Sequence, residues 1–115
     1  MIEILKTQDD KTLKKLTLNE AESGSWFNLV NPTFEEIQKV SIILDLEENF
    51  LRNSLDADEL SRTEYEDGNL LIITNIPFLD DEKNFDTLPL GIILTHEGVI
   101  TVCSKENKII NSFND

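Results

Sequence analysis

The densest group of side chains able to do chemistry lies in residues 54–69, SLDADELSRTEYEDGN, which place six carboxylates in sixteen positions. Carboxylate oxygens are the ligands that Mg²⁺ and Ca²⁺ prefer. A calcium loop of the EF-hand type that began at Asp56 and Asp58 would need an oxygen ligand and then a glycine shortly afterwards. The chain has Leu60 and Ser61 at those places, so this is not an EF-hand. The stretch is also typical of a solvated helix end and a turn, and both interpretations stay open.

The residues needed for nucleophilic catalysis or zinc binding are scarce. His96 is the single histidine and Cys103 the single cysteine. His96 falls at the tip of a predicted hairpin, and Cys103 lies in an apolar strand, where a buried thiol is inert. This pair does not supply the ligands of a structural zinc site, and four dispersed glycines do not form a phosphate-binding loop. We therefore do not expect an enzyme.

The net charge of −13 limits the partners of the chain. Its ten lysines and arginines are scattered singly, so we expect no nucleic-acid binding, and an anionic membrane surface would repel the protein. An acidic surface suits a divalent cation or a basic protein partner. The sequence shows neither a signal peptide nor an apolar run of about 18 residues, and 115 residues suffice for one folded domain over 1–115. We expect a soluble, cytoplasmic chain.

Two helices are predicted in the first half of the chain. The clearer one, over 34–44, begins with a capping box formed by Thr33 and Glu36. Its apolar residues recur at helical spacing, at Phe34, Ile37, Val40 and Leu44. The second helix, over 47–55, ends where the acidic stretch begins. Any ligands at that point would therefore be positioned by the end of a helix.

The rest of the chain has the period of strands. Strands are predicted over 2–6, 13–18, 26–30, 62–66, 69–76, 89–95 and 99–104. The pair Asp67-Gly68 is a strong hairpin turn signal. We expect Pro77 to end the strand before it, because proline has no N–H for a ladder, and 80–87 to form an acidic loop. The strand over 69–76 is apolar on both faces, which predicts a sheet covered on both sides.

Three segments, in this order and spacing, resemble the cytoplasmic N-terminal domain of the CorA-type magnesium and cobalt transporters. They are SWFNLVNPTFEEI, SLDADELSRTEYEDGNLLIITNIP and TLPLGIILTHEGVITVC. The likeness covers about residues 24–104 and is greatest to the CorA-like branch of the firmicutes. It implies an α/β fold, a three-layer α/β/α-type domain with a mixed β-sheet between helices and antiparallel hairpins.

The resemblance also implies a longer protein. In that family the domain precedes a stalk helix and two membrane helices joined by a Gly-Met-Asn loop, whereas Met1 is the single methionine here. We expect a truncated regulatory domain of a homopentamer on the cytoplasmic face of the cell membrane, attached to it only through missing C-terminal helices. The fragment itself should be monomeric or weakly associated. Its tail has apolar residues at helical spacing, Ile109, Ile110 and Phe113, and needs a surface to pack on.

A regulatory metal site is implied by the same resemblance. Family members bind Mg²⁺ between cytoplasmic domains, which keeps the pore closed, with carboxylates in a Leu-Glu-Asp string at the end of the second helix. That string reads Leu51-Arg52-Asn53 here, so an arginine replaces one acid and a neutral carbonyl oxygen the other. We expect a substitute set of ligands for Mg²⁺ or another divalent cation, formed by Asn53, Asp56, Asp58 and Glu59, with further ligands from the stalk or a neighbouring subunit.

The leading hypothesis is therefore a domain that regulates the gating of a divalent-cation (Mg²⁺/Co²⁺) transporter in response to intracellular Mg²⁺. One alternative is the corresponding domain of a zinc-transporting relative, which the presence of only one cysteine and one histidine disfavours. The other is a free-standing acidic domain that docks a basic protein. The open apolar face of the tail argues against that one.

Overall fold

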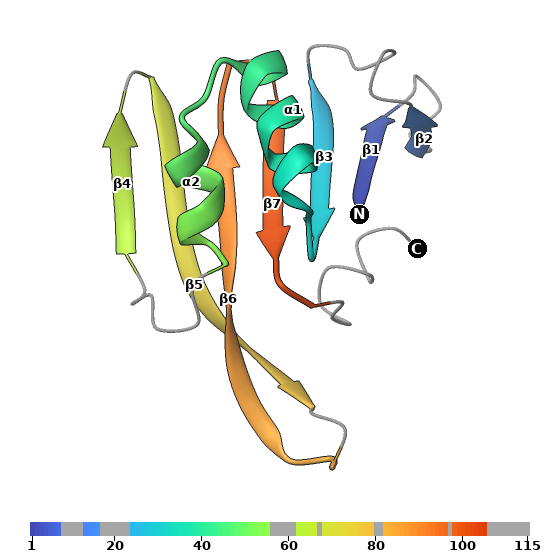
Figure 1. Cartoon of the computed structure of the whole chain (residues 1–115), viewed down its shortest axis with the longest axis vertical. Helices are drawn as coiled ribbons and strands as arrows, with labels where there is room; N and C mark the ends of the chain where they lie inside the picture. The colour runs from blue at the N-terminus through green and yellow to red at the C-terminus, as the bar shows by residue number, and fades with distance from the viewer. Residues whose placement is uncertain are drawn as a thin grey trace.

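A mixed β-sheet with two helices forms the body of the protein (Figure 1). The computed structural model describes residues 1–7, 13–16, 24–55, 62–66, 68–79, 82–96 and 98–105. The strands are β1 (Ile2–Thr7), β2 (Leu13–Leu16), β3 (Ser25–Val30), β4 (Arg62–Glu66), β5 (Asn69–Leu79), β6 (Phe85–Leu94) and β7 (Gly98–Cys103), and the helices are α1 (Phe34–Leu44) and α2 (Glu48–Asn53).

The seven described strands lie in the order β2-β1-β3-β7-β6-β5-β4. Strands β3 and β7 are parallel, and the other neighbours are antiparallel. The parallel pair requires a crossover, which α1, α2 and the three strands β4 to β6 provide. The predicted α/β class, with a mixed sheet and antiparallel hairpins, is confirmed.

Helix α1 has the predicted bounds because its local signals are complete. The Thr33 hydroxyl accepts a hydrogen bond from the backbone N–H of Glu36 at 3.2 Å, and a Glu36 carboxylate oxygen accepts one from the backbone N–H of Thr33 at 2.9 Å. Asp45, in a left-handed conformation with φ of 52°, ends the helix. Helix α2 is shorter than the predicted 47–55 and has no side-chain cap at its start.

Both helices cover the same face of the sheet, hereafter the first face (Figure 1). Its buried core consists of Ile4, Leu16, Phe27, Leu29, Ile37, Val40, Leu44, Leu46, Phe50, Leu51, Leu71, Ile73, Ile93, Ile100 and Val102. Because side chains alternate across a strand, the intervening residues lie on the second face. A separate cluster lies there, formed by Ile76, Leu88, Leu90 and Cys103 with Trp26 and Ile92 packed against them.

Strands β5 and β6 extend past their neighbours as a two-stranded arm (Figure 1). Two predictions were wrong here: Pro77 does not end its strand, and part of the expected loop is strand from Phe85 onward. Strand β4 begins at Arg62, opposite Ile73, so β5 is an edge strand beyond that pair within the described residues. Proline is tolerated at an edge because no neighbour there needs its N–H.

Some predicted features lie outside the described residues, namely Asp67 of the hairpin turn and the tail residues Ile109, Ile110 and Phe113. Gly68 has a φ of 84°, the left-handed conformation that favours glycine in such a turn. Within the part of the chain that the structure describes, neither helix is long and apolar enough to span a membrane.

Candidate metal site at the end of helix α2

The predicted ligands follow one another at the end of α2. Asn53 is the last residue of this helix and its side chain is half-buried. Asp56, Asp58 and Glu59 lie outside the described residues, so their role as ligands stays a prediction. Among the residues that are described, no three carboxylate, histidine or cysteine side chains lie close enough to hold a metal ion.

The end of α2 is packed directly on the backbone of β6. Ser54 is completely buried, and its hydroxyl donates a hydrogen bond to the carbonyl oxygen of Phe50 at 3.4 Å. A Cβ atom added to Gly91 would lie 1.8 Å from the Ser54 Oγ and 2.4 Å from the Ser54 Cβ. Only glycine allows this approach, which fixes the helix end that carries Asn53.

Arg52 makes two contacts, one with a residue of its own helix and one with helix α1. Its Nη2 atom lies 2.8 Å from the Glu48 Oε2, and its guanidinium carbon lies 4.6 Å from the centre of the Phe34 ring. Phe34 was predicted on the apolar side of α1 but is 57% exposed and stacks on this cation instead. The pairing of Glu48 and Arg52 four residues apart was readable in the sequence, whereas the contact between two helices was not.

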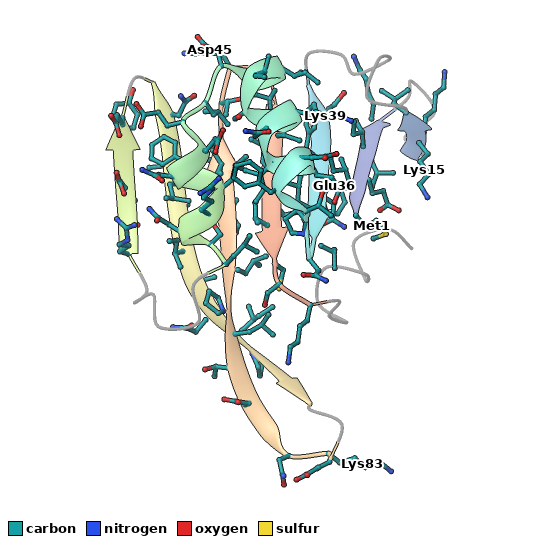
Figure 2. The ribbon with its side chains drawn as sticks, in the orientation of Figure 1. Met1, Lys15, Glu36, Lys39, Asp45 and Lys83 are labelled. Carbon is teal, nitrogen blue, oxygen red and sulfur yellow. The ribbon has the colours of Figure 1, made fainter. Side chains whose placement is uncertain are left out.

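The second electrostatic feature joins β1 to α1. The Met1 ammonium donates to the Val30 carbonyl oxygen at 2.8 Å and to the Glu36 Oε1 at 3.0 Å, and Figure 2 shows Met1 and Glu36 side by side. Partial burial raises the pKa of Glu36, but the hydrogen bond from the Thr33 backbone and the Met1 charge outweigh it and lower the pKa below its ordinary value of 4.5. This carboxylate therefore links the N-terminus to the start of α1.

The remaining candidates for chemistry are placed as the sequence predicts. His96 is exposed in the connection between β6 and β7, and Cys103 is 2% exposed on the second face of the sheet. A lone exposed imidazole and a buried thiol on separate elements do not form a catalytic pair.

The arrangement of sheet and helices defines a class of fold that solved structures share. The complete structure of the CorA magnesium transporter from Methanocaldococcus jannaschii matches with a TM-score of 0.84 and 24% identity, over 98% of this chain and 35% of that chain. The soluble domain of CorA from the same organism matches with a TM-score of 0.80 and 23% identity, over 98% of this chain and 44% of that chain. Full-length CmaX gives a TM-score of 0.73 and 14% identity, over 96% of this chain and 36% of that chain.

The fold is thus that of the soluble α/β domain of CorA. The family model described as "CorA-like Mg2+ transporter protein" matches residues 21–115, and the chain belongs to this family. The resemblance drawn from the sequence is confirmed, and a family of transporters fits the expectation that the chain is no enzyme. No curated protein matches the sequence. The chain spans less than half the length of each of these solved proteins.

Proposed function

We propose that this chain is the cytoplasmic domain of a CorA-like divalent-cation transporter and that Mg²⁺ bound at the end of α2 regulates transport. The observation that carries the proposal is the family match over residues 21–115, which includes both the helix end and the acidic residues after it. The whole transporter is proposed to be a homopentamer in the plasma membrane with this domain on the cytoplasmic side.

The packing of α2 supports a site at this place. Ser54 and Gly91 hold the helix end against β6, so Asn53 has a defined position from which a following carboxylate can complete a site. Mg²⁺ keeps several water ligands and needs only one or two protein carboxylates. Asp56 and Asp58 are enough to supply them.

The charge of the chain supports a role for the cation between copies. Each copy has a net charge of −13, so neighbouring copies repel one another unless cations lie between them. A cation bound between two copies favours their close packing by its greater affinity for that arrangement, and its loss favours separation. Regulation by Mg²⁺ then needs no further moving part in the domain.

A Mg²⁺ titration of the 115-residue chain, followed by amide shifts in NMR spectra, tests the site. We expect millimolar Mg²⁺ to move the amides of Asn53 and residues 56–60, and the double variant Asp56→Asn/Asp58→Asn to abolish these shifts. The control is Asp86→Asn, which removes an exposed carboxylate of the arm and should leave the shifts unchanged. If Asp86→Asn reduced the amide shifts as much as the double variant does, the shifts would come from general screening of the protein's charge rather than from a site.

Light scattering with and without Mg²⁺ tests the role of assembly. We expect the isolated chain to be monomeric without Mg²⁺ and to associate weakly, at most, when it is added. A stable pentamer of the 115-residue chain would contradict the proposal that the remaining parts of the transporter hold the assembly together. Absence of both amide shifts and association would reject regulation through this helix end.

A further inference from the structure

The arm formed by β5 and β6 has two edges that no other described strand covers (Figure 1). On the β5 side, β4 begins opposite Ile73, and on the β6 side, β7 ends opposite Leu90. The two strands of the arm continue to pair with each other from there to Leu79 and Phe85. An uncovered strand edge can pair with a strand of another molecule, and proteins commonly block such edges.

One hydrogen bond fixes which backbone groups of β6 point out of the arm. The Thr95 N–H donates to the Gly98 carbonyl oxygen at 2.9 Å, so the odd-numbered residues of β6 direct their N–H and C=O groups toward β7. The register of β6 with β7 and with β5 is unbroken, so this alternation continues to the end of the arm. The outward positions of the arm are therefore residues 85, 87 and 89 on β6 and, opposite them, residues 79, 77 and 75 on β5.

Each edge of the arm has a proline at one of its outward positions. On the β6 edge, Pro89 supplies no N–H, and the N–H of Thr87 donates to the Asp86 Oδ1 at 2.8 Å. On the β5 edge, Pro77 occupies the middle one of the three outward positions. A strand added to either edge would therefore meet a gap in the row of backbone donors.

The outer edges of the described sheet are protected in a different way. Strand β2 has four residues, two of them exposed lysines, and β4 has five residues, three of them charged. Short strands and charged side chains both hinder pairing with another strand. The strands of the arm have eleven and ten residues, and in 74–79 and 85–90 the one charged side chain is that of Asp86. On the arm, the prolines take the place of charge.

We propose that Pro77 and Pro89 prevent the arm from pairing edge to edge with the arm of a second copy of the chain. Two of the three prolines of the sequence lie at the six outward positions, one on each edge. Apart from them, the arm segments TNIPFL and FDTLPL have the apolar, weakly charged composition of strands that add to one another. A second copy offers the same edge, which is complementary to itself about a twofold axis. This proposal depends neither on Mg²⁺ nor on the proposed transporter.

The test restores the missing N–H at the exposed proline. Pro77 is exposed, so Pro77→Thr adds a donor and a strand-forming side chain without changing the core. The matched control is Pro32→Thr, the same substitution at the one proline outside the arm, before α1. Pro89 is buried, so Pro77→Thr/Pro89→Thr is the second variant, used once circular dichroism shows that it folds.

We expect sedimentation equilibrium to show that Pro77→Thr associates at least about tenfold more tightly than the original chain, because a twofold pair of edges uses the new N–H twice. Pro32→Thr should match the original chain. The folded double variant opens both edges and should form larger assemblies, in which each copy pairs on two sides. The proposal would be overturned if Pro77→Thr stayed monomeric at millimolar concentration, or if Pro32→Thr associated as tightly.

Amide hydrogen exchange shows whether the edge of the arm is the contact. In the associated form of Pro77→Thr we expect slower exchange of the outward amides at positions 77 and 79 than in the monomer. The amide of Ile76 points toward β6 and should change little. Association without slower exchange at positions 77 and 79 would overturn the proposal. Concentration-dependent protection of the arm edges in the original chain would also overturn it, because the edges would then pair despite the prolines.

Discussion

The contact between Gly91 and Ser54 makes Gly91→Ala the most informative substitution in the fold. The new Cβ would lie 1.8 Å from the Ser54 Oγ and 2.4 Å from its Cβ, where ordinary contacts begin at 3.4 Å. The end of α2 would have to move away from β6 by about 1.5 Å. Neither Ser54 nor β6 can move easily, because Ser54 is completely buried and β6 is held between β5 and β7.

The cost follows from overpacking of a buried contact, which is typically about 1–3 kcal/mol. We expect about 2–3 kcal/mol here, since the overlap involves two atoms of a side chain with 0% exposure. For a chain of 115 residues this corresponds to a fall in the melting temperature of about 8–12 °C. Urea unfolding monitored by circular dichroism measures the loss of stability, and the amide shift of Asn53 reports the movement of the helix end.

Two second-site variants identify the cause. Ser54→Gly removes both offending atoms and leaves the Cα at 3.6 Å, so Gly91→Ala/Ser54→Gly should regain more than about 1 kcal/mol relative to Gly91→Ala. Ser54→Ala keeps the Cβ at 2.4 Å and should regain little. The reasoning is refuted if Gly91→Ala stays within about 0.5 kcal/mol of the original chain, or if Ser54→Ala rescues as well as Ser54→Gly.

Three further predictions concern polar contacts. Glu36→Gln removes a partly exposed ion pair and should lower the free energy of unfolding by about 0.5–1 kcal/mol at pH 7. Because the folded-state pKa of Glu36 is lowered, this contribution is present above pH 4.5 and is lost in more acidic solution. The free energies of urea unfolding of the two proteins should therefore become equal in acid, and a difference that does not change with pH would contradict this. Thr101→Val leaves the Trp26 indole without its acceptor and should cost about 1–3 kcal/mol and shift the tryptophan emission, whereas an unchanged spectrum would count against the bond. Arg52→Gln leaves the Glu48 charge unbalanced and should tighten Mg²⁺ binding by a few fold in the NMR titration, whereas Glu48→Gln leaves the Arg52 charge unbalanced and should weaken it by a few fold. If both substitutions changed the affinity in the same direction, the charge of this pair would not be the cause.

Elements with complete local signals could be predicted from the sequence. The capping box and the apolar residues at helical spacing that define helix α1 all lie within a dozen residues, and the structure reproduces the predicted bounds of this helix. The hairpin formed by β4 and β5 was predicted from alternation and a glycine turn, and the pairing of Glu66 with Asn69 brackets that turn. In both cases the information that decides the structure is close together in the chain.

Features that depend on distant neighbours were not predictable in this way. The prediction that a strand ends at Pro77 treats β5 as a strand with partners on both sides, whereas β4 starts only opposite Ile73. Pro89, within β6, is likewise one residue beyond the last pair between β6 and β7, at Leu90 and Cys103. Both prolines are compatible with the ladder because the neighbouring strand is already absent there among the described residues, which only the register shows.

The candidate metal site could likewise be predicted from the sequence only in part. The acidic residues after α2 and the spacing of Glu48 and Arg52 were visible in the sequence, but the contact of Arg52 with Phe34 on the other helix was not. The structure pairs Arg52 with Glu48 and stacks it on Phe34, so the end of α2 carries a neutral pair instead of an isolated positive charge. A cation next to Asn53 would therefore meet little net repulsion from Arg52, and its affinity would be set by the carboxylates that follow. An arginine at this position weakens the family's motif without excluding a divalent cation from this end of the helix.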